Sequence, residues 1–141
     1  MMKTGLNVHS GLYRPSGVSS NQGPVVLVSR EHPLDPGAVP GPGQLEAVAP
    51  GVLLARTAAA LYRDILREIG GEGEIVAVRG YRSREEQAQI YADTLRQRGR
   101  RYTSTYVALP GCSEHETGLA IDVAKRAASI DDVTPGFPYS G

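Results

Sequence analysis

The sequence of 141 residues contains few of the residues that would mark several common classes of protein. Its single cysteine, Cys112, excludes an intrachain disulfide and a four-cysteine zinc knuckle. Fifteen basic and fifteen acidic residues give a formal net charge of zero, so charge gives no argument for a nucleic acid or an anionic membrane as partner. With only three histidines, His9, His32 and His115, a metal site would have to combine them with Asp or Glu.

Long apolar segments are absent as well. The first residues, M-M-K-T-G-L-N-V-H-S-G, lack the apolar core of a secretory signal, which favours a cytoplasmic location. No run approaches the roughly 20 apolar residues of a membrane-spanning helix, so we expect no membrane span. Hydrophobic residues make up 40% and charged residues 21% of the chain, as in folded soluble proteins, and its length suits one domain.

Composition divides the chain into a lead-in and one folded domain. Residues 1–23 are rich in Gly, Ser and Asn and predict a flexible N-terminal lead-in, which leaves 24–141 as the domain. The domain opens with P-V-V-L-V-S-R at 24–30, a β-branched run that predicts a strand. The next segment, 31–43, carries four prolines and three glycines and predicts a loop.

Helical periodicity begins after this loop. Apolar residues recur at steps of three and four over 52–69, which predicts a helix with one buried stripe. Gly70 and Gly71 follow at the position expected for a C-terminal stop. The predicted stripe consists of Leu54, Ala58, Leu61, Ile65 and Ile69.

A strand and a second helix follow. The run E-I-V-A-V-R-G-Y at 74–81 predicts a strand. Ser83 with Glu86 three residues later has the signature of a capping box, so a second helix is expected to begin there. The basic cluster R-Q-R-G-R-R at 96–101 is expected to end this helix as a solvated terminus. The residues expected on its inner face are Ala88, Tyr91 and Leu95.

The predicted order of elements is strand, long loop, helix, strand, helix, loop and strand. The chain shows neither internal repeats nor a second composition regime, and the alternation of strands and helices typical of parallel sheets is weak. We therefore expect a small α+β domain in which helices pack on a mostly antiparallel sheet.

The last predicted strand belongs to a stretch rich in reactive side chains, G-C-S-E-H-E-T-G-L-A-I-D-V at 111–123. Apolar side chains alternate there with small ones, so the apolar set is expected to pack on the core. The opposite face would offer one carboxylate, that of Asp122, with room beside it. The core-facing set would be Leu119, Ile121 and Val123, and the other set Ala120, Asp122 and Ala124.

His115 and Asp122 can form a pair only if the chain doubles back. Fully extended, the seven steps from His115 to Asp122 would span about 23 Å, at roughly 3.3 Å per residue. Gly118 stands where such a turn is needed, and a His nitrogen with an Asp oxygen suits zinc. By spacing alone, a turn histidine and a capping carboxylate are the commoner interpretation.

The complete string reverses that preference. S-E-H-E-T-G-L-A-I-D at 113–122 matches the pattern S-x-H-x-x-G-x-A-x-D and resembles the zinc D,D-carboxypeptidases and D,D-dipeptidases of the VanY/VanX type, which trim D-Ala-D-Ala from peptidoglycan precursors. G-Y-R-S at 80–83, with Gln87 four residues on, resembles a second element of that family. L-V-S-R-E-H-P-L at 27–34 and the final D-V-T-P-G-F-P-Y-S-G are similar to it as well.

The resemblance implies a hedgehog/D,D-peptidase-like fold and a hydrolase that acts on a peptidoglycan stem peptide or on D-Ala-D-Ala. His115 and Asp122 would be two of three protein ligands to a catalytic Zn²⁺, which keeps a further position open for water. Arg82 would be catalytic, stabilising the oxyanion as water attacks the scissile carbonyl, and would also bind substrate. Ser113 would contact the substrate near the metal, and Gln87 would line the pocket.

A serine or cysteine nucleophile is the competing interpretation of the same stretch. A serine hydrolase needs a base that a third group orients. Ser113 and His115 are only two residues apart, and no nucleophile elbow surrounds the serine. Cys112 lies beside the site, but the sequence shows nothing that would activate its thiol. The zinc interpretation is therefore preferred.

The sequence departs from the family at the end of the site. Family members complete the site downstream with a Glu-x-x-His element, in which the glutamate is the general base and the histidine the third ligand. After His115 the chain has no histidine, and its only later glutamate is Glu116, which is expected to point into the turn. The chain also lacks the tryptophan of the usual Glu-x-Trp-His form. His32, beside a proline, and His9, in the lead-in, are poor substitutes.

Two explanations of this departure are open. A truncated zinc D,D-peptidase would lack the Glu-x-x-His segment and the last strand or strands, which would leave a sheet edge unpaired. A non-catalytic relative would instead keep a groove that binds a peptidoglycan peptide or a zinc ion without turnover. The resemblance continues to the last residues of the sequence, which favours the first explanation.

Overall fold

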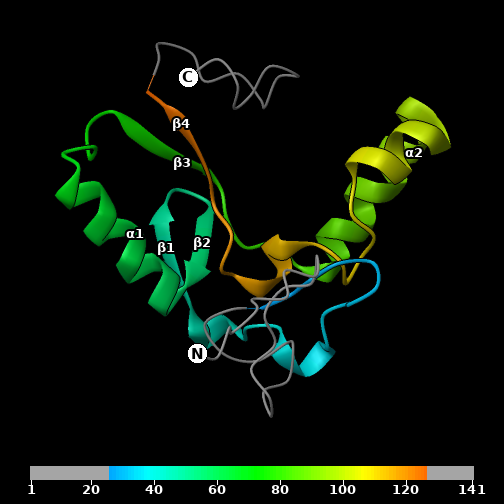
Figure 1. Cartoon of the computed structure of the whole chain (residues 1–141), viewed down its shortest axis with the longest axis horizontal. Coiled ribbons are helices and arrows are strands. Elements are labelled where there is room, and N and C mark those ends of the chain that lie inside the picture. The colour runs from blue at the N-terminus through cyan, green and yellow to red at the C-terminus, as the bar shows by residue number, and fades with distance from the viewer. Residues whose placement is uncertain (1–25, 127–141) are drawn as a thin grey trace, which may run out of the picture.

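A computed structural model of the chain describes residues 26–126, in which two antiparallel sheets are combined with two helices (Figure 1). In Figure 1, α1 and α2 stand on opposite sides of the described part, with the strands and the loop before β4 between them. The predicted α+β fold class is confirmed. In chain order the elements are the 3₁₀ turns Pro36–Ala38 and Pro42–Gln44, strands β1 (Leu45–Ala49) and β2 (Val52–Ala55), helix α1 (Arg56–Glu68), strand β3 (Ile75–Arg79), helix α2 (Arg84–Tyr106), the 3₁₀ helix η3 (Glu114–Thr117) and strand β4 (Asp122–Lys125).

The first sheet is a β1–β2 hairpin that the sequence patterns missed. Its turn contains Pro50 and Gly51, and Gly51 adopts φ 73, a left-handed conformation that glycine reaches at little cost. Residues 52–55, predicted as the first turn of a helix, are strand β2, and α1 begins only at Arg56. A short apolar run fits a buried strand and a buried helical turn equally well, so periodicity could not separate the two.

Helix α1 buries a different face from the predicted stripe. It lies against β1 and β2 with Ala59 completely buried. The Arg63 guanidinium donates to the Glu46 carboxylate at 2.5 Å and to the Ala47 carbonyl at 2.9 Å, which fastens the helix to β1. Leu54 is buried at 1% exposure as predicted, but it belongs to β2. The exposed members of the predicted stripe are Leu61 (62%), Ile65 (55%) and Ile69 (59%).

Helix α2 begins as predicted. The Glu86 N–H donates to the Ser83 hydroxyl oxygen at 3.1 Å, and the Ser83 N–H donates to the Glu86 carboxylate at 2.8 Å, which completes the capping box. The helix breaks at Gly99 (φ 78, ψ 170), inside the cluster predicted to end it, and then resumes. Because the Gln87 amide donates to the Ala108 carbonyl at 2.7 Å, the chain must reverse its direction at this break.

The predicted inner face of α2 is wrong. Ala88 is exposed, Leu95 is 40% exposed and Tyr91 is half-buried, whereas Gln87 and Thr103 are 1% and 0% exposed. These two polar side chains can be buried because each has a hydrogen-bond partner. The Thr103 hydroxyl donates to the carbonyl four residues earlier at 2.9 Å. A count of apolar periodicity cannot detect a buried face that is made of polar residues.

Two strand predictions need correction. The part of the predicted strand 24–30 that the structure describes is not a strand. Ser29 and His32 instead close a turn, in which each backbone N–H donates to the other residue's carbonyl, at 3.0 and 3.2 Å. Strand β4 begins at Asp122 rather than at 119, and of the predicted core face only Ile121 is half-buried, while α1 lies against β1 and β2. Leu119 and Val123 are 39% and 37% exposed.

The interior of the described residues gathers around the loop that joins α2 to β4. Buried polar side chains there need internal hydrogen-bond partners. No helix in residues 26–126 is long and apolar enough to cross a membrane. The predicted lead-in, 1–23, lies outside the described residues, so the domain limits stay a prediction. The buried apolar residues are Leu34, Val52, Leu54 and Ala59, and the buried polar ones are Gln87, Thr103, Ser113, His115 and Glu116.

Candidate active site

The loop that contains η3 turns the chain back on itself. Ser113 caps η3, and its hydroxyl oxygen accepts from the His115 N–H at 3.4 Å. Gly118 ends η3 with φ 71 and ψ 6, the left-handed conformation common after helix C-termini. The Ala55 N–H donates to the Gly118 carbonyl at 2.8 Å, which fastens the turn to β2. The turn expected at Gly118 is therefore present, and it brings His115 back to Asp122.

His115 and Asp122 meet at 3.6 Å, measured from imidazole Nε2 to carboxylate Oδ2. The imidazole Nδ1 lies 2.8 Å from the Gly80 carbonyl oxygen. Because a carbonyl can only accept, Nδ1 carries the hydrogen, and in the neutral ring Nε2 turns its lone pair toward Asp122. Metal-binding histidines are commonly oriented by such a bond on the other ring nitrogen. His115 is 8% exposed, whereas the Asp122 side chain keeps 34% of its surface.

Gly80 places that carbonyl, and only glycine fits there. A Cβ at Gly80 would lie 2.2 Å from the Leu53 carbonyl oxygen, far inside van der Waals contact. The Tyr81 N–H donates to the same carbonyl at 2.6 Å, and the Arg82 N–H donates to the His115 carbonyl at 3.1 Å. Burial, with a smaller effect of nearby carboxylates, raises the pKa of Tyr81 and keeps its phenol uncharged at neutral pH. The G-Y-R-S element thus connects β2 to the His115 loop.

Arg82 is oriented by a buried neighbour. Its Nη1 donates to Gln87 Oε1 at 2.8 Å, and the Gln87 amide donates to the Ala108 carbonyl at 2.7 Å. Gln87 is 1% exposed, so its amide cannot exchange these partners for water, and it sets the direction of the guanidinium. The sequence predicted Gln87 as a substrate-binding residue that lines the pocket, and the structure adds this positioning contact.

Glu116 is fully buried and organises the loop. Its carboxylate accepts from the Gly111 N–H at 2.8 Å and from the Ser113 N–H at 3.2 Å, and it lies 3.6 Å from Arg84 Nε. Arg84 Nη2 in turn donates to the Leu34 carbonyl at 2.7 Å, which joins the loop to the N-terminal segment. A carboxylate engaged in this way is not available as a general base, in agreement with the sequence prediction.

The sequence patterns did not predict the Arg84–Glu116 pair or the cap of η3. Ser113 and Glu116 form a second capping box, S-E-H-E, with the same S-x-x-E signature that located the start of α2. Its signal was therefore available in the sequence. No sequence pattern marked Arg84, because its partner Glu116 lies 32 positions further along the chain.

One pocket of about 530 Å³ collects the five predicted site residues. It is bordered by Arg82, Gln87, Ser113, His115 and Asp122. Its walls come from the end of β3, from both ends of α2 and from the η3 loop. Its other lining residues are Arg79, Ile90, Tyr106, Val107, Ala108 and Glu114, none of which the sequence analysis had singled out.

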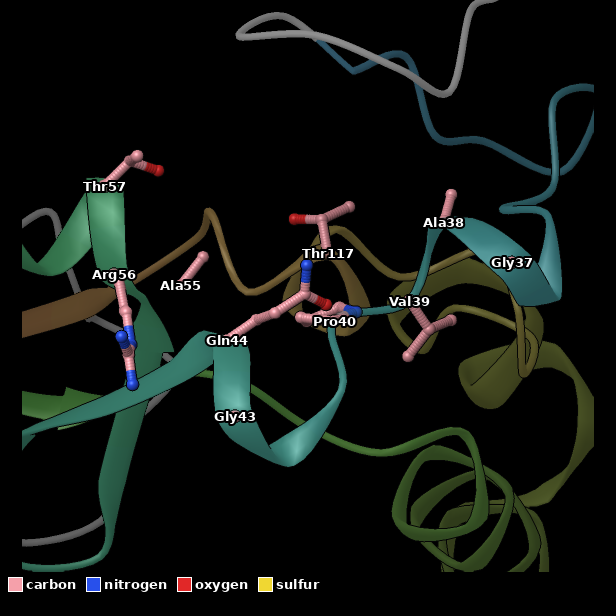
Figure 2. Close-up of a pocket in the computed structure, with 10 residues that line it drawn as sticks. All are labelled: Gly37, Ala38, Val39, Pro40, Gly43, Gln44, Ala55, Arg56, Thr57 and Thr117. Atoms are coloured by element: carbon pink, nitrogen blue, oxygen red, sulfur yellow. The ribbon is translucent and has the colours of Figure 1, made fainter.

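A second pocket meets η3 only at Thr117 and has a different lining (Figure 2). It measures about 440 Å³ and lies between the two 3₁₀ turns and the start of α1. Figure 2 shows Gln44 and Arg56 on one side of it and the glycine and alanine of the first turn on the other. None of its ten lining residues in the described chain is a predicted site residue. The predicted site residues therefore lie in the pocket around His115 and not in this second pocket.

The described residues provide two donors for a metal ion rather than three. Among residues 26–126 no group of three His, Cys, Asp or Glu side chains lies close enough to share an ion. His32 stays in its own turn, with Nδ1 3.4 Å from the Ser29 hydroxyl oxygen. His9 lies outside the described residues.

The geometry argues against a serine nucleophile. The Ser113 hydroxyl caps η3, while the two ring nitrogens of His115 face the Gly80 carbonyl and Asp122. The imidazole is thus engaged elsewhere, whereas serine catalysis needs it as the base that takes the hydroxyl proton. Cys112 is a free thiol of intermediate exposure beside this loop.

The pocket brings an imidazole and a carboxylate together beside an oriented guanidinium, and these are groups that hydrolysis of an amide bond can use. The family model VanY, D-alanyl-D-alanine carboxypeptidase, matches residues 52–138, and the chain belongs to this family.

Individual relatives agree with this assignment. The bifunctional D-Ala-D-Ala dipeptidase and D-Ala-D-Ala carboxypeptidase VanXYC of Enterococcus gallinarum is 37% identical over 113 residues, which cover 79% of this chain and 60% of the relative. The structure of the D,D-dipeptidase VanXYg, in complex with a D-Ala-D-Ala phosphinate analogue, aligns with a TM-score of 0.68 and 42% identity, over 82% of this chain and 46% of that one.

A third relative was solved with a metal. A variant of the D,D-pentapeptidase VanY from a VanB-type resistance cassette, in complex with Zn(II), aligns with a TM-score of 0.61 and 25% identity. The alignment covers 73% of this chain and 62% of that one. In each of these three comparisons, the chain spans less than two thirds of the relative's length.

Proposed function

We propose that this chain carries a zinc-dependent peptidase site that hydrolyses the D-Ala-D-Ala end of peptidoglycan stem peptides. The carrying observation is the pair of His115 and Asp122, in which Nδ1 is held by the Gly80 carbonyl and Nε2 lies 3.6 Å from Oδ2. The Zn(II) of the related VanY structure and the D-Ala-D-Ala analogue of the VanXYg structure support the choice of ion and substrate.

The His115–Asp122 pair has the dimensions of two zinc ligands. Zinc binds His nitrogen and Asp oxygen at about 2.0–2.2 Å, so two ligands of a tetrahedral ion lie about 3.4 Å apart. The observed separation of 3.6 Å needs little adjustment. Once bound by these two residues, the ion would polarise the scissile carbonyl and lower the pKa of water.

Arg82 supplies a positive charge where an oxyanion can develop. Because Gln87 already orients its guanidinium at 2.8 Å, little reorganisation is needed during the reaction. Ser113 and Gln87 border the same pocket and would contact the substrate beside the reacting carbonyl. Removal of one preorganised donor of this kind typically lowers kcat by about 10²–10³.

A second candidate function, binding without turnover, follows from the count of metal ligands. Residues 26–126 contain no third ligand in a cluster with His115 and Asp122, and Glu116 is engaged in the loop. Two protein ligands hold zinc less firmly than the three of a catalytic site. A non-catalytic relative would keep the pocket and bind a peptidoglycan peptide or a zinc ion without cleaving anything.

Zinc titration and release of D-Ala from a peptide ending in D-Ala-D-Ala separate these candidates. The full chain of 141 residues would be used. His115→Ala should lower zinc affinity by about 100-fold or more, since loss of a mere supporting group already costs about 10–100-fold. His32→Ala is the matched control and should change nothing, because His32 stays in its own turn.

Each outcome of this experiment decides between the candidates. Release of D-Ala that His115→Ala abolishes would establish the peptidase. Binding of zinc and peptide without release would establish the binding function. Zinc binding that survives His115→Ala would contradict both, because the ion would then sit elsewhere.

A further inference from the structure

Arg79 brings a second guanidinium group to the candidate active site. It is the last residue of β3 and pairs with Asp122 across the antiparallel ladder of β3 and β4. The register of this ladder shifts between Ala77 and Arg79, and such a bulge changes the direction of the side chain beside it. Arg79 and Asp122 both border the pocket with His115.

The two arginines reach the pocket from different sides. Arg82 is bound through Nη1 to the buried Gln87 of α2. Arg79 comes from the sheet, beside Asp122, and is half-buried. A peptide that places its scissile carbonyl between Arg82 and the His115–Asp122 pair therefore meets a second cationic side chain in the same pocket.

The charges around the pocket favour a ligand with a negative charge of its own. Among the described residues that line the pocket, the charges of Arg79 and Arg82 are balanced by those of Asp122 and Glu114 while the His115–Asp122 pair holds no ion. A divalent cation there would make the sum positive. A peptide bond is neutral, but the free carboxylate at the end of a peptide is not, and a planar guanidinium binds a carboxylate through two parallel hydrogen bonds.

We propose that Arg79 is a substrate-recognition residue that pairs with the free C-terminal carboxylate of the peptide. The inference rests on the proposed function, because it takes His115, Asp122 and Arg82 as the reacting side of the pocket. The terminal carboxylate lies one residue beyond the scissile carbonyl, about 3.8 Å from one Cα to the next, so two neighbouring cations can serve the two groups. Arg79 thereby selects the end of a chain over an internal peptide bond.

Binding of an acid and of its amide tests this pairing. A non-hydrolysable phosphinate analogue of D-alanyl-D-alanine and the C-terminal amide of the same analogue, which lacks the terminal charge, would be titrated calorimetrically into the full chain with Zn²⁺ present. The unmodified chain should bind the acid about tenfold more tightly, as expected for one charged hydrogen-bonded pair. Arg79→Gln should weaken binding of the acid by about the same factor and leave the amide unchanged. Arg79→Lys keeps the positive charge but lacks the planar guanidinium, so it should restore part of the difference in affinity between acid and amide.

Arg100→Gln is the matched control, because Arg100 is exposed on α2 and does not border the pocket. Circular dichroism on heating would check the fold of each variant, and the acid-to-amide ratio of the unmodified chain tests the inference without any variant. A ratio near one, or an equal effect of Arg79→Gln on both ligands, would overturn the role of Arg79 and leave the proposed function intact. If the chain with Zn²⁺ binds neither ligand, the proposed function fails, and the role of Arg79 fails with it.

Discussion

Helix α1 exposes large apolar side chains, whereas the η3 loop buries polar ones. On α1 the large apolar residue Ile65 is 55% exposed, whereas the loop buries Ser113 to 3% and Glu116 to 0% exposure. The loop can do this because each buried polar group has a partner within the loop or on an adjoining segment. An apolar helical face cannot be buried by local contacts in this way, because it needs an apolar surface from another part of the structure to pack against.

The contrast indicates where the rigidity of the candidate active site originates. Glu116 holds the backbone N–H groups of Gly111 and Ser113, and through Arg84 it reaches the N-terminal segment. His115 lies between these contacts and keeps its tautomer through Gly80. Substitutions in the loop should therefore cost more stability than substitutions of the larger apolar residues on α1.

The largest effect is expected for Glu116→Ala. It leaves two buried N–H groups without an acceptor and removes the charge partner of Arg84, so we expect a loss of about 3 kcal/mol or more in the free energy of unfolding. Urea denaturation measures the loss. Glu114→Ala on the same turn is the control and should stay within about 0.5 kcal/mol, because Glu114 is exposed. Similar small losses for both variants would show that the loop does not depend on the buried carboxylate.

A smaller effect is expected for Gly118→Ala. Gly118 has φ 71, and an added Cβ would lie 3.2 Å from both the Ala55 backbone nitrogen and the Pro40 ring. Strain and crowding together should cost about 2 kcal/mol, and the shifted turn should also weaken zinc binding. Gly51→Ala separates the two causes, because Gly51 has φ 73 with nothing within 4 Å of an added Cβ. It should cost about 1 kcal/mol from strain alone, and equal losses would mean that the close approach at Gly118 contributes nothing.

The smallest effect is expected for Ile65→Gln on α1. An exposed position away from specific contacts should change the free energy of unfolding by no more than about 0.5 kcal/mol. Leu54→Ala is the reference, because Leu54 is 1% exposed and its truncation should cost about 3 kcal/mol. A loss above about 1 kcal/mol for Ile65→Gln would show that another part of the protein covers this face, and the contrast with the loop would disappear.

Features whose partners are close in sequence could be predicted. Ser83 and Glu86 marked the start of α2 because both halves of a capping box lie within one turn. Gly118 marked the doubling back of the chain, and the family motif identified His115 and Asp122 as members of one site. The roles of these residues in catalysis stay predictions until they are measured.

Features whose partners are distant could not be predicted. The side of α1 that carries Ala59 lies against β1 and β2, where Arg63 also reaches Glu46, 17 positions away, and apolar periodicity selected a different stripe. Only its pairing with β1 distinguishes strand β2 from the first turn of a helix. The 37% exposure of Val123 likewise did not follow from the alternation of residues in β4.

The sequence by itself determined the membership of this chain in the D-alanyl-D-alanine carboxypeptidase family, the α+β class, and the local turns and caps, because all of these depend on residue types at short spacing. Only the tertiary structure decided which nitrogen of His115 faces Asp122, how Gln87 orients Arg82, and that Arg79 borders the same pocket. These arrangements join residues as far as 43 positions apart, such as Arg79 and Asp122. The physical reason is that directional contacts of this kind exist only after the backbone has folded.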